Sequence, residues 1–344
     1  MTTLRARAYA KINLGLRILG RRADGFHELR TIFQTISLAD TVTLRLGPGR
    51  GVRLESVQAA AAVDWPAMSE EKNLACRAAQ LAQEEFGPRA RIGVRLSKRI
   101  PVGAGLGGGS ADAAAVLRLM AARARRPLPP AELHRVAAEL GSDVPALLCG
   151  GTVLGLGRGE ECYPLPSLPP WHCLLAAPAM AVKTATAFQR WDALHLTAGR
   201  RRPARRGAMA GAAGGLTGAE NSATIQTLLG LLRRTYPGGP LRRVAPASRF
   251  GRDRGLALAG SRVRAGIEND FDEAVFPLSP DFSVIRSALR RAGAVWVGLS
   301  GSGAAQYGLF GDRTAAEVAR AALPARARSW TARFVRPAAA LAPW

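Results

Sequence analysis

The sequence predicts an α+β protein with two domains, and three observations support that prediction. The chain has 344 residues, more than the ~100–200 residues of a typical single domain. Strand-like and helix-like segments follow one another without the strict alternation of a parallel βαβ protein. Four prolines between Pro164 and Pro170 interrupt the pattern near the middle of the chain. We therefore expect one domain over residues 1–168 and a second over residues 169–344.

In the first half, alternation of apolar and polar residues predicts strands, and apolar spacing near 3.6 predicts helices. Strands are expected over residues 5–20, 27–46 and 91–97, and a hairpin over 152–156 and 161–165. Helices are expected from Asn73 to Phe86, from Ser110 to about Arg125, and from Pro130 to Gly141, with a turn over 142–145.

In the second half, strands are expected over 171–177, 294–298 and 331–335, with a further strand after a glycine turn at 299–303. Helices are expected over 184–195 and 314–323. Residues 197–265 are rich in Arg, Gly and Ala and are predicted to be an insertion, with a helix over 219–232.

The net charge of +23 raises the question of a nucleic-acid partner. Residues 190–265 carry fifteen Arg against three acids, a net charge of 15 − 3 = +12. That stretch has few aromatic residues to stack on bases, so we do not expect nucleic acid to be the partner.

The remaining composition excludes several classes of protein. The four cysteines form no C-x-x-C pair and the four histidines no His-x-x-x-His pair, so neither a disulfide framework nor a zinc site is expected. The chain has neither an apolar run of ~20 residues nor a signal-peptide core, so we expect a cytoplasmic protein without a membrane anchor.

A glycine-rich loop is the most informative motif. Five of the seven residues from Gly103 to Gly109 are glycine, a strand pattern precedes them and a helix pattern follows. Backbone N–H groups in such a loop, together with a helix N-terminus, bind phosphate. The acidic residue of a dinucleotide fold is missing about 20 residues on, and the chain has no Gly-Lys pair of a P-loop. A tight turn without a ligand remains the alternative.

Lysine usage singles out two further positions. The chain has 44 Arg and 4 Lys, and Lys11 and Lys98 lie in its most motif-like segments. A lysine retained in such a chain suggests a need for the compact ammonium group.

Three segments together resemble the GHMP kinase superfamily of small-molecule kinases. They are residues 8–14, the loop 101–111, and Gly298-Leu-Ser-Gly-Ser-Gly-Ala304, in the order typical of that superfamily. Residues 22–29, 107–110 and 141–145 resemble the members that act on cytidine-diphosphate-linked methylerythritol. The resemblance covers residues 1–190 and 266–344. It implies an N-terminal domain of the ribosomal-protein-S5 domain 2 type and a ferredoxin-like C-terminal domain.

The resemblance also implies roles for particular residues. Lys11 and Asp143 would be the catalytic pair, Asp143 as general base and Lys11 as the group that orients the hydroxyl and offsets charge. The alternatives are that Asp143 caps a short helix and that Lys11 is a surface charge. The ATP site would comprise Pro101, Val102, Gly103, Ala104, Gly105, Leu106, Gly107, Gly108, Gly109, Ser110 and Ala111, together with Asn73 and Lys98. Asn73 is equally well suited to cap the helix that follows it.

Five residues would bind the cytidine-bearing substrate: Asn13, Phe26, His27, Thr184 and Phe188. Phe26 and Phe188 could equally be ordinary core residues. The implied reaction is phosphorylation of the substrate's 2-hydroxyl by ATP with Mg²⁺, in the non-mevalonate isoprenoid pathway. The metal ligands are not assigned, although Ser110 is one candidate. A superfamily member that acts on homoserine or mevalonate is the second hypothesis, and the protein is expected to be a monomer or a homodimer.

Overall fold

The computed structural model describes residues 1–60, 69–195 and 269–337. The predicted insertion over 197–265 and its helix over 219–232 lie outside these ranges.

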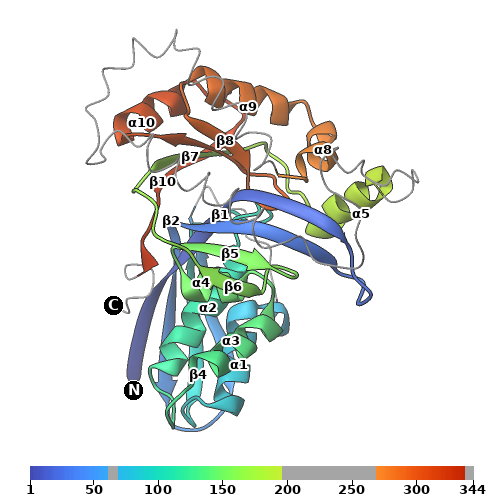
Figure 1. The fold of residues 1–344 in the computed structure, drawn as a ribbon. Helices are drawn as coiled ribbons and strands as arrows, with labels where there is room; N and C mark the ends of the chain where they lie inside the picture. Colours follow the sequence, from blue (N-terminus) through green and yellow to red (C-terminus); the bar gives the residue numbers. More distant parts are fainter. Residues whose placement is uncertain (61–68, 196–268, 338–344) are drawn as a thin grey trace.

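A mixed sheet of six strands forms the first half of the structure (Figure 1). Its strands are β1 (Thr2–Arg21), β2 (His27–Gly47), β3 (Val52–Ala59), β4 (Arg91–Lys98), β5 (Thr152–Leu156) and β6 (Glu161–Pro164). The order is β3-β4-β2-β5-β6, and β1 pairs with β2. The long β1–β2 hairpin keeps its register from Thr2 opposite Leu46 to Arg21 opposite His27, apart from three register shifts.

Four helices pack in this half: α1 (Leu74–Glu85), α2 (Gly108–Ala121), α3 (Pro130–Leu140) and α4 (Val144–Cys149). The central helix α2 contacts β1, β2 and the other three helices. Its many alanines are buried, so neighbouring backbones can approach it closely. Alternate residues of β1 from Ala6 to Ile18 are buried in the core. This leaves the intervening positions, which include Lys11 and Asn13, free to serve a site on the other face of the strand.

The second half contains a four-stranded antiparallel sheet of β7 (His172–Ala177), β8 (Trp296–Leu299), β9 (Gln306–Phe310) and β10 (Arg328–Arg333). The strand order is β10-β7-β9-β8, the ferredoxin-like arrangement 4-1-3-2. Its helices are α5 (Thr184–His195), α8 (Asp272–Val275), α9 (Asp281–Arg291) and α10 (Arg313–Ala321). Helices α9 and α10 cover one face of this sheet (Figure 1). One hydrophobic core joins the two halves, since Cys173, Tyr307 and Phe334 pack in the same cluster as Ile12 and Val116.

Several elements differ from the sequence prediction, among them the short helix α8, which was not predicted. Residues 52–59 form a strand that was not predicted, because a register shift near Ser56 breaks its alternation. The turn predicted over 142–145 continues into the short helix α4, which tolerates Pro145 because proline is compatible with the first turn. Helix α9 was also not predicted, although Phe282, Ile285 and Leu289 form its buried face.

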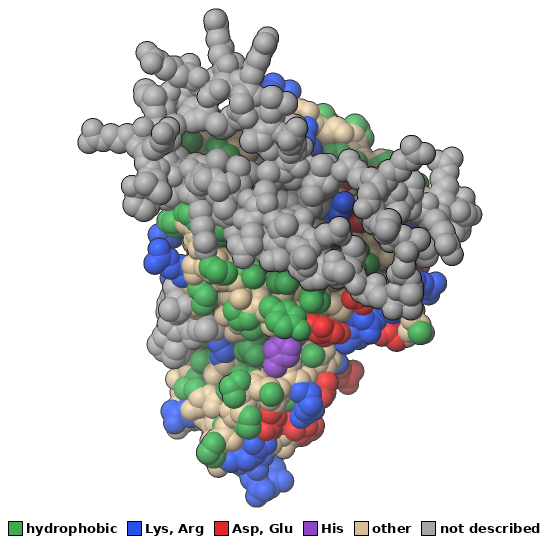
Figure 2. Space-filling model, in the orientation of Figure 1, with side chains coloured by type: hydrophobic (Ala, Val, Ile, Leu, Met, Phe, Trp, Pro, Cys, Tyr) green, Lys and Arg blue, Asp and Glu red, His purple; other side chains and the backbone are tan. Residues whose placement is uncertain are grey.

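The described surface mixes charges of both signs. On the face shown in Figure 2, acidic and basic side chains lie next to one another over the lower part of the molecule. Ion pairs near the surface include Arg135–Glu139 within α3 and Arg126–Glu132, which joins the α2–α3 connection to α3. No helix within the described ranges is long and apolar enough to cross a bilayer.

Candidate active site

A cavity of about 740 Å³ lies between the two sheets and gathers most of the predicted site residues. Its lining includes both predicted catalytic residues, five glycines of the loop with Ser110, and all five residues predicted to bind substrate. They are Lys11, Asp143, Gly103, Gly105, Gly107, Gly108, Gly109, Ser110, Asn13, Phe26, His27, Thr184 and Phe188. Residues far apart in the sequence, such as Lys11 and Phe188, therefore share one cavity.

The phosphate loop alternates left-handed glycines with buried apolar residues. Gly103, Gly105 and Gly107 have φ angles of +68°, +74° and +71°, which side chains with a Cβ rarely adopt. Between them, Ala104 and Leu106 are buried. Gly107 precedes α2, whose first hydrogen bond to the loop runs from the Ala111 N–H to the Gly107 carbonyl. The N–H groups of the first helical turn therefore face the cavity without an intrahelical acceptor.

The glycine turn of the second half holds this loop in place. The Ser300 hydroxyl donates to the Gly105 carbonyl at 3.0 Å, and the Ala305 N–H donates to the Ala104 carbonyl at 3.0 Å. On the other side, the Lys11 N–H donates to the Leu106 carbonyl at 3.1 Å. The loop is thus fastened to β1 and to the turn after β8.

Lys11 and Asp143 meet at the centre of the cavity. The Lys11 Nζ lies 3.3 Å from Asp143 Oδ2 and donates to Asn13 Oδ1 at 2.8 Å. Although Asp143 directly precedes α4, its side chain makes no capping hydrogen bond. Lys11 is only 4% exposed, so it is not a surface charge. The geometry therefore fits neither a helix cap at Asp143 nor a surface charge at Lys11.

Local irregularities in β1 orient the side chains of Lys11 and Asn13 toward the cavity. Register shifts between Tyr9 and Lys11 and between Asn13 and Gly15 flank the two cavity-facing residues. The Asn13 amide donates to the Thr31 hydroxyl on β2 at 2.7 Å, and Thr31 in turn donates to the Gly15 carbonyl. The Asn13 side chain is therefore fixed with its oxygen toward Lys11.

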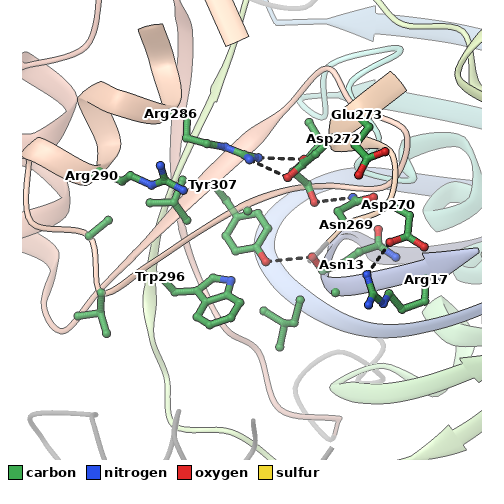
Figure 3. A pocket seen from close by; sticks show the side chains of 17 residues that line it. Asn13, Arg17, Asn269, Asp270, Asp272, Glu273, Arg286, Arg290, Trp296 and Tyr307 are labelled. Atoms are coloured by element: carbon green, nitrogen blue, oxygen red, sulfur yellow. Dashed lines mark hydrogen bonds and ion pairs between the residues drawn. The ribbon is translucent and has the colours of Figure 1, made fainter. Parts of the chain in front are cut away.

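A smaller cavity of about 190 Å³ shares Asn13 and shows how the second half holds β1 (Figure 3). The Tyr307 hydroxyl donates to the Asn13 carbonyl at 3.0 Å, and burial raises the pKa of this phenol, which keeps it protonated as a donor. Asp270 accepts from the Ile18 N–H and from Arg17, while the Asn269 amide donates to the carbonyls of Leu299 and Gly301. These contacts link β1, which carries Lys11, to the glycine turn that holds the glycine-rich loop.

Aromatic side chains line the far end of the main cavity. His27 and Phe188 stack with ring centroids 4.3 Å apart, and His27 Nε2 lies 2.7 Å from Asp192 Oδ1. Phe26 is 51% exposed and carries the Arg158 guanidinium 4.7 Å from its ring centroid. Phe26 is therefore not a core residue, whereas Phe188 also packs against the core residue Phe271. An exposed aromatic face beside a guanidinium suits a pyrimidine ring with attached phosphates.

Two residues assigned to ATP have other partners. The Asn73 side chain accepts hydrogen bonds from the N–H groups of Ala75 and Cys76, so it caps α1. The Lys98 ammonium is buried between Asp40 and Asp112 and does not line the cavity. Neither side chain reaches the cavity lining, and an ATP contact from either residue stays a prediction.

The other loop residues support the cavity without lining it. They are Pro101, Val102, Ala104, Leu106 and Ala111. Sequence reasoning did not find Thr31, Arg158, Asp192, Asn269 and Ser302, although Ser302 pairs with Thr184 at 3.0 Å between their hydroxyl oxygens. Arg158 lies in a Gly-Arg-Gly-Glu stretch that was interpreted only as a hairpin turn, and Ser302 lies in the segment 298–304, which was used only for the resemblance. Thr31, Asp192 and Asn269 were not singled out as site residues.

The described residues contain no cluster of three or more His, Cys, Asp or Glu side chains suited to a metal ion. Ser110, in the first turn of α2 beside the glycine-rich loop, is among the residues that line the cavity. One or two oxygen ligands beside nucleotide phosphates are what Mg²⁺ requires when it arrives with a nucleotide. The donor set therefore fits a nucleotide-bound Mg²⁺ and not a metal held by protein ligands alone.

Comparison with known proteins agrees with this geometry. Residues 73–151 match the model of the GHMP kinases N terminal domain, and residues 254–329 match that of the GHMP kinases C terminal domain. The second match begins inside the segment predicted to be an insertion. A crystal structure of a 4-(cytidine 5'-diphospho)-2C-methyl-D-erythritol kinase superposes with a TM-score of 0.68 at 30% identity, covering 96% of this chain and 99% of the other. The predicted two-domain GHMP fold is confirmed.

A homoserine kinase from Cytophaga hutchinsonii has a TM-score of 0.64 at 20% identity, covering 98% of this chain and 95% of its own, and shows the fold alone. Two sequence relatives are more informative. The 4-diphosphocytidyl-2-C-methyl-D-erythritol kinase of Solibacter usitatus is 41% identical over 90% of this chain and 82% of its own length. The kinase of the same name from Gloeobacter violaceus is 36% identical over 94% of this chain and 91% of its own length. On these matches, and with the phosphate loop and Lys11–Asp143 pair in one cavity, the chain belongs to the 4-diphosphocytidyl-2-C-methyl-D-erythritol kinase family of the GHMP kinases.

Proposed function

We propose that this protein transfers the γ-phosphoryl group of ATP to the 2-hydroxyl of 4-diphosphocytidyl-2-C-methyl-D-erythritol, a step of the non-mevalonate isoprenoid pathway. The observation that carries the proposal is the position of the Lys11–Asp143 pair. The pair lies in one cavity with the phosphate loop and with the aromatic group around Phe26 and Phe188. A nucleotide phosphate and a cytidine-bearing alcohol can therefore meet at the two charged side chains.

In the proposed reaction, Asp143 accepts the proton of the attacking hydroxyl. Phosphoryl transfer depends mainly on positioning and on stabilising charge, so a single well-placed base is sufficient. Lys11 holds the carboxylate at 3.3 Å and is itself oriented by Asn13, so its positive charge is fixed beside the reacting oxygen. The loop N–H groups and the N-terminus of α2 bind the phosphates of ATP.

The proposed nucleotide is the magnesium complex of ATP. When bound with the nucleotide, Mg²⁺ would offset part of the negative charge of the phosphates. The Ser110 hydroxyl is the side chain that would contribute to its coordination.

At the opposite end, the proposed contacts to the substrate follow from the chemistry of cytidine diphosphate. Phe26, His27 and Phe188 offer ring faces for the pyrimidine, while Asn13 and Thr184 line the path toward the alcohol. Arg21 and Arg158 also line the cavity, and their guanidinium groups suit a diphosphate.

The test is a panel of alcohols in an assay of ADP release with ATP and Mg²⁺. We expect robust turnover with 4-diphosphocytidyl-2-C-methyl-D-erythritol and none with homoserine or mevalonate. Turnover with homoserine or mevalonate, and none with 4-diphosphocytidyl-2-C-methyl-D-erythritol, would refute the proposed substrate. Cytoplasmic location, a monomeric or dimeric state and the absence of a nucleic-acid partner remain predictions from the sequence.

A further inference from the structure

A buried cluster of three charged side chains lies outside the cavity, at the base of the phosphate loop. Lys98 is the last residue of β4, Asp40 lies on β2, and Asp112 lies on α2. The Lys98 ammonium forms ion pairs with both carboxylates, and no side chain of the three is more than 2% exposed. None of them lines the main cavity.

The cluster joins the two ends of the loop. Lys98 ends the strand before the loop and Asp112 follows the loop in α2, so their ion pair closes the segment between them. Asp40 Oδ1 accepts hydrogen bonds from the N–H groups of Arg99 and Ile100, the two residues that connect β4 to the loop. A Cβ on Gly108 would lie 3.7 Å from Asp40 Oδ2, which places this carboxylate beside the start of α2 as well.

Stability alone is a weak explanation for such a cluster. Burying charged groups costs desolvation free energy, and apolar side chains of similar size often stabilise a protein as well or better. One ammonium also faces two carboxylates, and burial raises the pKa of Asp112 to about 7. The ionic cluster makes directional hydrogen bonds to the backbone next to the loop, which apolar side chains could not make.

We infer that Asp40, Lys98 and Asp112 are positioning residues that set the phosphate loop for the ATP triphosphate from outside the main cavity. The inference rests on the proposed function for the identity of the nucleotide. Asp40 is the key member, because it alone contacts both the lysine and the N–H groups of Arg99 and Ile100. The alcohol end of the cavity is fastened separately, through Asn13, Thr31 and Tyr307.

The test uses two substitutions at Asp40 in the full chain. Asp40→Asn keeps an oxygen acceptor for the loop but loses the charge, and Asp40→Leu loses both. We expect KM for ATP to rise about threefold in the first and about tenfold or more in the second. KM for the alcohol should stay within about twofold of the wild-type value, because its contacts are held elsewhere. Asp312→Leu is the matched control, since Asp312 also accepts a backbone N–H, from Ala315 at 2.8 Å, but caps α10 away from the cavity.

Several results would overturn the inference. An Asp40→Asn enzyme with unchanged KM for ATP would overturn the inference, even if Asp40→Leu does not fold. Equal increases in the KM values for ATP and the alcohol would indicate a general structural defect. Loss of folding in Asp40→Asn itself would assign the cluster to folding. A wild-type enzyme without ATP turnover would contradict the proposed function instead, so the two failures are distinguishable.

Discussion

Gly105 offers the sharpest test of the loop geometry. Its φ is +74°, and a Cβ there would lie 2.1 Å from the Ser300 carbonyl oxygen and 2.9 Å from that of Gly303. Gly105→Ala should therefore cost about 1–2 kcal/mol for the left-handed backbone. Separating the loop from the turn also breaks the Ser300–Gly105 hydrogen bond, for about 1 kcal/mol more. A total of about 2–3 kcal/mol corresponds to a Tm lower by about 4–12 °C for a domain of this size.

The matched control is Gly109→Ala, two residues into α2. Its backbone is helical, and a Cβ there would meet only Leu74 Cδ1 at the ordinary distance of 3.5 Å. Alanine should stabilise this helical position by about 0.5–1 kcal/mol. Scanning calorimetry of the two variants without nucleotide gives the comparison. A Gly105→Ala protein whose Tm lies within about 2 °C of the wild type, or equal losses in both variants, would refute the reasoning.

Two further predictions concern the aromatic end and the buried cluster. Phe188→Ala should raise KM for the cytidine-bearing alcohol about 5- to 150-fold, because it removes one stacking contact, and should leave KM for ATP unchanged. Steady-state kinetics measures both values. Equal increases in KM for the alcohol and KM for ATP would contradict the assigned role. Burial raises the pKa of Asp112 to about 7, so the folded state holds this proton more tightly than the unfolded chain, and its contribution to stability should fall as pH rises from about 4 to about 7. The free energy of unfolding, measured with urea across this pH range, should no longer decline in Asp112→Asn. An identical pH dependence in the wild type and the variant would show that Asp112 is not the cause.

Local chemistry explains what the sequence could predict. The glycines of the loop need conformations that few other residues adopt, and the alternation from Ala6 to Ile18 marks a strand with one buried face. Both signals depend on neighbouring residues only, so they can be read without the fold. The positions of Lys11 and Asp143 came from resemblance, and the structure brings their side chains to within 3.3 Å.

Long-range contacts explain what the sequence could not predict. Lys98 was singled out by lysine usage and assigned to ATP from the resemblance, yet its ammonium pairs with Asp40 and Asp112, which lie 58 and 14 residues away in the sequence. Asn269 holds the glycine turn through backbone carbonyls 30 and 32 residues further on. Neither choice of partner has a local pattern, because the fold alone brings together residues that lie far apart in the sequence.

The central claim is that Asp143 is the base that serves the alcohol in this cavity. The most direct measurement is single-turnover ADP formation by wild-type enzyme and Asp143→Asn, with 4-diphosphocytidyl-2-C-methyl-D-erythritol, ATP and Mg²⁺. Because the Asp143 side chain makes no capping bond, the variant should fold with wild-type Tm and bind ATP. Its rate should fall by about 10²–10⁴-fold, the usual contribution of a general base. A folded Asp143→Asn enzyme that reacts at close to the wild-type rate would contradict the account.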